Sequence, residues 1–239
     1  MAETPSLSTL SATELFELRQ ELYEKMHTAF TVEFEPQLQD YYDIFWDCPF
    51  IEEAQWEALI SDDELEEYFE NQFASSIMHA YVLKSGLFFW QHCLETLSEE
   101  FTPLELAYLS NWNDATFSFF TVTDISEDKH EVELEDLFNG QTYVVLDEEL
   151  GEFSEIGELL GLMVVPISDS QYTLEPLMMT PVIGEEQEVL RSLLEQEFEM
   201  LSLDEGQTVQ EFLKKNSIFY YWLEMVLFSN RQQFKEEGK

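Results

Sequence analysis

FSFFTVTDISEDKHEVELEDLFNGQTYVVLDEELGEFSEIGELLGLMVVPISDSQYTLEPLMMTP, residues 117–181, is the stretch in which the hydrophobic period of the chain changes from helical to strand-like. Aromatic and β-branched residues dominate its first part, FSFFTVTDI (117–125), and HEVELEDLF (130–138) alternates between apolar and acidic residues. Such patterns predict short strands with one buried face. Three further runs complete a set of five strands: QTYVVL (141–146), ELLGLMVVPI (158–167) and QYTLEPLMM (171–179).

Turn residues between these runs indicate how the strands connect. Asn139-Gly140 predicts a tight hairpin between the second and third strands, because both positions of the favoured turn need a positive φ. DEELGEFSEIG, residues 147–157, is expected to be a loop. Five short strands in sequence order favour a small antiparallel β-barrel or a strongly curled meander, since closure removes the exposed edges of a sheet.

Helical patterns lie on both sides of this stretch. Four capping boxes, in which a hydroxyl and a glutamate three residues later satisfy each other's backbone N–H groups, mark helix starts. They are Ser11–Glu14, Ser61–Glu64, Thr102–Glu105 and Thr208–Glu211. We expect the first helix to end near Phe30, and the last to run unbroken from Thr208 through Leu227.

The predicted fold is therefore α+β. It comprises an N-terminal helical region (1–114), a small five-stranded antiparallel barrel (115–182) and C-terminal helices (183–239) that pack back on the N-terminal helices. No linker of low complexity separates these parts, so they are expected to form one compact unit.

The charge of the chain restricts its partners. The formal net charge is −41, from 51 acidic and 10 basic residues, whereas 45% of residues are hydrophobic and 15% aromatic. The apolar content is sufficient for a folded core. The charge disfavours direct binding to nucleic acid or to an anionic membrane, because like charges repel, and it favours a basic protein partner.

Cysteine usage and the N-terminus favour a cytoplasmic location. The two cysteines, Cys48 and Cys93, lack the spacing of a disulfide framework or a zinc site. The first residues have neither a basic region nor an apolar run of the kind found in signal peptides. No apolar stretch of about 20 residues predicts a transmembrane helix. The oligomeric state is left open.

Several motifs in and around the strand region resemble a known group of proteins. The chain is similar to the helix-then-barrel segment of uncharacterised bacterial proteins that often carry a SEC-C metal-binding motif. The resemblance covers about half of the chain. It is carried by TPLE (102–105), FSFFTVTDI (117–125), LEDLFNG (134–140), GELL (157–160), LMVVP (162–166) and FLKKN (212–216), together with Leu109, Trp112, Tyr143 and Asp147.

The resemblance implies the arrangement of helices followed by a small barrel, and it implies no enzymatic activity. The present chain ends in FSNRQQFKEEGK and has no cysteine cluster there, so no SEC-C metal site is carried over. No catalytic residue is implied either.

Residues that could carry chemistry are few. The best candidate for a metal-ligand or nucleophile pair is His92-Cys93, with His79 in the preceding helical segment. Adjacent residues of a helix point about 100° apart, so His92 and Cys93 would not easily bind one metal ion together. Ordinary packing in an aromatic core is the favoured interpretation. Glycine-rich phosphate loops and GxSxG are missing, which argues against nucleotide-binding enzymes and α/β-hydrolases. We predict no catalytic residue, metal ligand or cofactor.

Runs of carboxylates recur along the chain, and solvation explains most of them. The best candidate for a binding surface is the acidic stripe of Glu131, Glu133, Glu135 and Asp136. The first three alternate with apolar residues and so share one face of a strand. This stripe is predicted to meet a basic partner.

These observations predict a non-catalytic, highly acidic cytoplasmic protein that acts through protein–protein contacts with a basic, nucleic-acid-binding partner. Three alternatives stay open. One is an enzyme that uses clustered carboxylates and a divalent metal. Another is a DNA- or RNA-mimic inhibitor, whose carboxylates imitate phosphates. The last is a structural module without a ligand, which a filled barrel without a polar pocket would favour.

Overall fold

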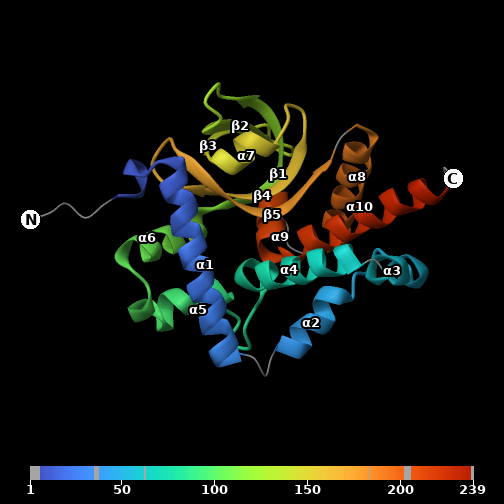
Figure 1. Ribbon diagram of the computed structural model, residues 1–239, viewed down its shortest axis with the longest axis horizontal. Coiled ribbons are helices and arrows are strands. Elements are labelled where there is room, and N and C mark those ends of the chain that lie inside the picture. Colours follow the sequence, from blue (N-terminus) through green and yellow to red (C-terminus); the bar gives the residue numbers. More distant parts are fainter. Residues whose placement is uncertain (1–5, 35–37, 62, 183, 202–205, 238–239) are drawn as a thin grey trace, which may run out of the picture.

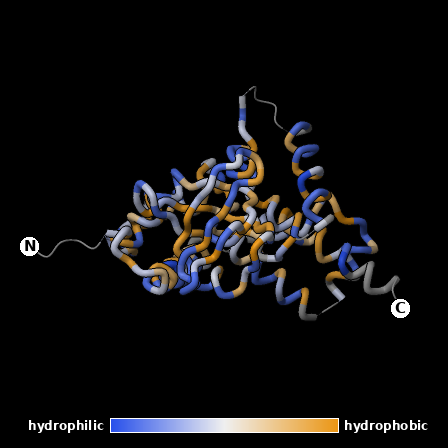
Figure 2. The backbone as a smooth tube through the Cα atoms, turned by 90° about the horizontal axis from the view of Figure 1, so that it is seen from above, coloured by the Kyte–Doolittle hydropathy of each residue, from blue (hydrophilic) through white to orange (hydrophobic). Residues whose placement is uncertain are grey.

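The computed structural model describes residues 6–34, 38–61, 63–182, 184–201 and 206–237 (Figure 1). Its strands form a closed barrel, α7 lies against that barrel, and the other helices lie below it and at its sides. Apolar segments gather towards the middle of the molecule, while hydrophilic segments lie mainly at its periphery (Figure 2). None of the helices within the described ranges is long and apolar enough to cross a membrane.

The helices begin where their capping residues place them. The Ser11 hydroxyl accepts from the Glu14 amide at 3.2 Å, and the Glu14 carboxylate accepts from the Ser11 amide at 2.8 Å. The pairs Thr102–Glu105 and Thr208–Glu211 form the same reciprocal bonds. The Ser61–Glu64 pattern includes residue 62, which lies outside the described residues.

Helices account for most of the chain outside the barrel. They are α1 (Ala12–Phe34), α2 (Leu38–Trp46), α3 (Glu53–Ile60), α4 (Asp63–Ala80), α5 (Phe89–Thr96), α6 (Pro103–Asn111), α7 (Glu148–Phe153), α8 (Glu185–Leu201), α9 (Val209–Lys215) and α10 (Ile218–Glu237). Short 3₁₀ helices occur at Leu7–Thr9, Ser98–Glu100 and Trp112–Asp114.

Three helical predictions need correction. Helix α1 continues one turn beyond Phe30, because Phe34 packs its ring on that of Phe30 at a centroid distance of 5.8 Å. Residues 147–157 are not wholly a loop, since the Asp147 carboxylate accepts from the Leu150 amide at 2.7 Å and starts α7. The last helical stretch breaks at Asn216, whose backbone leaves the helical conformation and separates α9 from α10.

The barrel consists of five strands in the order β1-β2-β3-β5-β4. They are β1 (Thr116–Ile125), β2 (Glu131–Asp136), β3 (Thr142–Leu146), β4 (Leu159–Pro166) and β5 (Tyr172–Val182). Four of the pairings are antiparallel, but β3 and β5 pair in parallel at Val145 and Tyr172. The predicted small five-stranded barrel is confirmed, with the difference that one of its pairings is parallel and not antiparallel. An odd number of strands cannot alternate in direction around a closed ring, so one pair must be parallel.

The β2–β3 hairpin is present, but its turn differs from the predicted one. Gly140 has a φ of +70°, whereas Asn139 is not among the residues with positive φ. The loop is closed instead by a bond from the Gly140 amide to the Asp136 carbonyl at 2.9 Å. Asp136 also accepts from the Phe138 amide through its side chain, which stabilises a longer turn that needs only one left-handed residue.

Two hydrophobic cores hold the molecule together. One fills the barrel interior, and its buried members are Phe120, Val122, Val132, Leu134, Tyr143, Val145, Leu150, Leu160, Leu162, Val164 and Leu174. The other joins the helices to the outer faces of β1, β4 and β5, with Phe119 stacked on Tyr220 of α10 at 4.9 Å. The barrel is therefore a packed support, and space for a ligand lies outside it.

Candidate functional site

The acidic stripe lies on the outer face of β2, apart from its last member. Glu131 and Glu135 are exposed and Glu133 is half-buried, whereas the intervening Val132 and Leu134 point into the barrel. These three glutamates therefore form the strand face that their spacing predicted. Asp136 is 1% exposed and cannot meet a partner.

The buried position of Asp136 has a structural explanation. Its carboxylate accepts from the Phe138 amide at 2.8 Å, from the Asn139 amide at 3.2 Å and from Gln210 Nε2 of α9 at 3.1 Å. Asp136 thus shapes the β2–β3 loop and ties it to α9. From here on, "acidic stripe" denotes Glu131, Glu133 and Glu135 alone.

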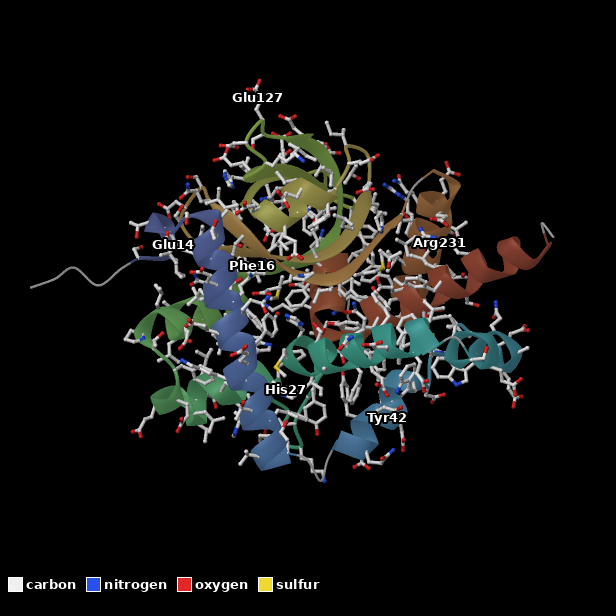
Figure 3. All side chains as sticks on the ribbon, in the orientation of Figure 1. Glu14, Phe16, His27, Tyr42, Glu127 and Arg231 are labelled. Atoms are coloured by element: carbon white, nitrogen blue, oxygen red, sulfur yellow. The ribbon has the colours of Figure 1, made fainter. Side chains whose placement is uncertain are left out.

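Further acids extend the acidic stripe at the end of the barrel. Asp124, which pairs with Glu133 across β1 and β2, is exposed, as are Glu127 and Asp128 in the turn between these strands. Figure 3 shows Glu127 at the tip of the barrel, away from the helices. The structure therefore places exposed carboxylates together at the β1–β2 end of the barrel, beside the start of α1.

The histidine and cysteine candidates do not form a metal site. Within the described ranges, no three His, Cys, Asp or Glu side chains lie close enough to hold an ion together. His79 stacks on Trp112 at a centroid distance of 4.9 Å, and His92 packs edge-on against Phe34 at 5.2 Å. Cys93 is fully buried. The aromatic-core interpretation of His79, His92 and Cys93 fits this packing.

A buried ion pair that the sequence did not indicate lies between α1 and the barrel. Arg19 NH2 is 2.8 Å from Asp147 Oδ2, and both side chains are 5% exposed. Arg19 NH1 also donates to the Leu174 carbonyl. Burial alone would lower the pKa of Arg19, but the charges of Glu175 and Asp147 outweigh burial and raise that pKa, so Arg19 is cationic.

Beside this pair lies a fully buried carboxylate, Glu175 of β5. The Tyr23 hydroxyl donates to Glu175 Oε2 at 2.6 Å, and the Tyr108 hydroxyl donates to Oε1 at 2.5 Å. Burial raises the pKa of Glu175, while Arg19 and the two phenols act in the opposite direction. Burial next to Glu175 raises the pKa values of both tyrosines well above the ordinary value, so they remain hydrogen-bond donors.

His79 continues this hydrogen-bonded chain into the helical core. Its Nε2 is 2.6 Å from the Tyr23 hydroxyl. Burial lowers the pKa of His79 to about 3, so the ring is neutral near physiological pH. The Tyr23 hydroxyl therefore bridges the Glu175 carboxyl group and the His79 ring. The chain Glu175–Tyr23–His79 links β5, α1 and α4.

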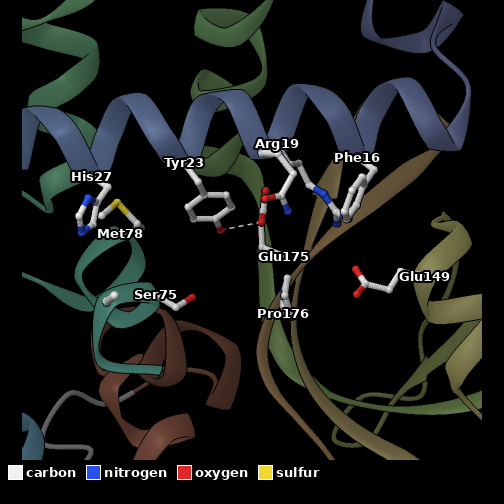
Figure 4. Close-up of a pocket in the computed structure, with 11 residues that line it drawn as sticks. Phe16, Arg19, Tyr23, His27, Ser75, Met78, Glu149, Glu175 and Pro176 are labelled. Atoms are coloured by element: carbon white, nitrogen blue, oxygen red, sulfur yellow. Dashed lines mark hydrogen bonds between the residues drawn. The ribbon is translucent and has the colours of Figure 1, made fainter. Parts of the chain in front are cut away.

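A cavity of about 290 Å³ opens above Glu175 (Figure 4). Figure 4 shows side chains from α1 hanging over it, Glu175 and Pro176 below it, and Glu149 of α7 pointing towards it from one side. We call this space the α1–α4 cavity. Its lining residues are Phe16, Arg19, Gln20, Tyr23, His27, Ala74, Ser75, Met78, Glu149, Glu175 and Pro176.

A second buried glutamate, Glu224 of α10, leads to a testable pH dependence. Its Oε1 accepts from the Thr180 amide at 3.0 Å, from the Thr180 hydroxyl and from the Tyr68 hydroxyl at 2.7 Å. Its Oε2 is buried without a hydrogen-bond partner in the part of the chain that the structure describes. Burial raises the pKa of Glu224 above 4.5, although these hydrogen bonds oppose the shift.

Because the folded state binds this proton more tightly than the unfolded state, Glu224 favours folding below pH 4.5, and that contribution is lost as the pH rises through the raised pKa. We therefore expect the Tm of the Glu224→Gln variant to fall less between about pH 4.5 and about pH 8 than the Tm of the unchanged protein, because glutamine does not ionise. Glu188→Gln, at an exposed position of α8, removes the same charge and serves as the control. Equal pH profiles for the two variants would contradict this role of burial.

The sequence offered weak signals for these buried groups. Glu175 interrupts the apolar run of QYTLEPLMM, and an acid inside such a strand pattern is a sign of a buried polar contact. Arg19 is one of only 10 basic residues in the chain. Their partners come from segments far apart in the sequence, so the cluster itself could not be assembled from spacing.

The fold and site define an α+β protein with a small closed barrel, in which four strand pairings are antiparallel and one is parallel. Along the chain, the barrel follows the N-terminal helices and precedes the C-terminal helices. Residues 66–218 match the model of a family described as "Family of unknown function (DUF7986)". Since the match covers more than half of the chain, the protein belongs to this family. A search of curated proteins finds no match. The resemblance to SEC-C-associated proteins is not tested by these findings and stays a prediction.

Proposed function

We propose that this chain is a non-catalytic acidic protein of the bacterial cytoplasm that binds a basic protein partner through the acidic stripe on β2. The observation that carries the proposal is the arrangement of Glu131, Glu133 and Glu135 on the outer face of β2, where Glu131 and Glu135 are exposed. The net charge of −41 supports it, because the field of the whole protein attracts and orients cationic segments.

The geometry of the acidic stripe suggests the form of the partner. Alternate residues of a strand repeat every 6.5–7 Å, roughly twice the rise per residue. A basic segment in an extended conformation, with Lys or Arg at every second position, has the same repeat. Glu127 and Asp128 at the adjacent turn lengthen the surface by further carboxylates. Exposed pairs of this kind are weak singly and are screened by salt, so several must act together.

A designed peptide of alternating Lys and Thr tests the proposal. We expect it to bind at low ionic strength and to be released at high salt. The variant E131Q/E133Q/E135Q should weaken binding about tenfold, which corresponds to the loss of three exposed ion pairs. Titration calorimetry or fluorescence anisotropy measures the change.

The control variant is E188Q/E195Q/E199Q, which removes three exposed carboxylates from one side of α8. Both variants alter the net charge equally. A difference between their affinities for the peptide therefore shows that the position of the removed charges matters. If the α8 variant weakens the peptide as much as the β2 variant, binding is a general effect of charge and the proposal fails.

In the nucleic-acid-mimic alternative, the carboxylates of the same acidic stripe would imitate phosphates and occupy the nucleic-acid site of a DNA- or RNA-binding protein. Retention of such proteins on the immobilised chain at low salt, and their displacement by DNA, would favour it. The divalent-metal enzyme is tested by calorimetry with Mg²⁺, Mn²⁺ and Ca²⁺. No contact within the described residues favours that alternative.

A further inference from the structure

The α1–α4 cavity combines charge with apolar walls in a way that the proposed contact with a basic protein does not use. Phe16, Gln20, Tyr23 and His27 line it from α1, and Ala74, Ser75 and Met78 line it from α4. Glu149 points towards it from α7, and the buried Glu175 lies at its floor (Figure 4). The cavity lies outside the acidic stripe, on the helical side of the barrel.

The charges around the cavity favour a cation. Arg19 is the cationic side chain in the lining, and its charge is opposed by Asp147, at 2.8 Å, and by Glu175. Arg19 also donates to a backbone carbonyl and lies over the Phe16 ring at 5.6 Å, so it is held in place. The exposed carboxylate of Glu149 remains without such a cation in the cavity lining. In a protein with a net charge of −41, an anionic ligand would enter against both the local and the global field.

The walls favour an organic cation over a metal ion. Much of the wall is apolar: it includes the rings of Phe16 and Tyr23, the thioether of Met78 and the pyrrolidine of Pro176. These groups pack well against hydrocarbon, and among them only the Tyr23 phenol has an oxygen that could bind a metal ion. Within the described ranges, no cluster of three ligating side chains could hold a metal. A volume of about 290 Å³ is at the lower end for small-molecule sites, which fits a ligand with a short apolar body.

We propose that the α1–α4 cavity binds a small organic cation, of the class of primary amines with a short apolar body. The ammonium group pairs with the exposed carboxylate of Glu149, and the body lies against Phe16 and Tyr23, where the ring faces also attract positive charge. Glu175 is fully buried beneath the Tyr23 hydroxyl. Its carboxyl group therefore acts on the ligand through the phenol, without direct contact.

Benzylamine is the probe for the first experiment, with benzyl alcohol and benzoate as matched comparators that keep the ring and change the charge. Calorimetry near neutral pH and at moderate salt should show saturable benzylamine binding. The affinity of both comparators should be lower than that of benzylamine by a factor of about ten or more. Neither can form the hydrogen-bonded ion pair between an ammonium group and the Glu149 carboxylate. MgCl₂ is titrated separately to test for an inorganic ion site.

Two neighbouring glutamates provide matched variants. Glu149→Gln removes the carboxylate that points towards the cavity, and benzylamine binding should weaken about tenfold. Glu148→Gln makes the same change one residue earlier, at a carboxylate that accepts from the Thr13 hydroxyl at 2.9 Å and does not line the cavity. Binding to this control should stay within about twofold of the unchanged protein, since it leaves every proposed contact in place. Glu175→Gln should weaken binding by a smaller factor.

Several results would overturn the proposal. One is a failure of benzylamine to saturate the protein below about 10 mM, which would mean that binding is too weak for a specific site. Another is comparable affinity for benzoate or benzyl alcohol, which would show that charge is not recognised. Competition by Mg²⁺ would indicate an inorganic ion site. Equal effects of E149Q and E148Q would place the amine elsewhere on the acidic surface. This last comparison remains decisive even if the Glu175 variant does not fold.

Discussion

Arg19→Met is expected to lower the free energy of unfolding by about 3–5 kcal/mol, the usual cost of removing one partner from a buried ion pair. The substitution keeps much of the apolar side chain but leaves the Asp147 carboxylate, which is 5% exposed, without its cation. It also removes the donor to the Leu174 carbonyl. Chemical denaturation monitored by tryptophan fluorescence measures the change.

Arg191→Met provides the control, because Arg191 is exposed on α8 and its only described hydrogen bond, to the Leu137 carbonyl, is 3.3 Å long. Its cost should be below about 1 kcal/mol. Asp147→Asn adds a further test, since the amide oxygen still accepts from the Leu150 amide and keeps the start of α7. In the double variant R19M/D147N, the cost should be smaller than the sum of the two single costs. Additive costs would contradict a direct ion pair.

Gly161→Ala is expected to destabilise the protein by about 1–3 kcal/mol through overpacking. Gly161 lies in β4 between Phe119 of β1 and Met178 of β5. A Cβ atom there would lie 2.6 Å from Tyr220 Cδ1 and 2.9 Å from Met178 Cβ. Tyr220 is fully buried and cannot move away into solvent. Thermal and chemical denaturation test the expected loss.

Tyr220→Leu identifies the contact responsible. If the clash with the Tyr220 ring causes the loss, Gly161→Ala should cost less in the Tyr220→Leu background than in the unchanged protein. An unchanged cost would assign the effect to Met178 or to the strand itself. The comparison therefore tests whether Gly161 is the position that lets α10 approach the barrel closely.

Local patterns predicted much of the architecture. The capping boxes at Ser11, Thr102 and Thr208 start helices where expected, since their bonds form within four residues. The period-2 alternation around Val132 and Leu134 correctly assigned the inner and outer faces of β2. The break before α10 and the short helix after Asp147 depend on single residues, Asn216 and Asp147, whose weak local signals are easily missed.

Of the two candidate sites, the sequence predicted one and missed the other. The acidic stripe follows from strand spacing, apart from Asp136, whose carboxylate is drawn inward by amides of its own loop and by Gln210, 74 residues away. The α1–α4 cavity unites Arg19, Glu149 and Glu175 from three elements. No periodicity relates these residues, because their contacts depend on how α1 docks on the barrel.

By itself, the sequence determined the elements, the strand faces and the charge, because these depend on neighbouring residues and on composition. Tertiary structure alone decided the parallel β3–β5 pair, since ring closure of five strands constrains directions that each hairpin leaves free. It also decided which charges are buried. Arg19, Asp147 and Glu175 are ordinary polar residues in the sequence, and only the exclusion of water between α1 and β5 makes them an interacting cluster.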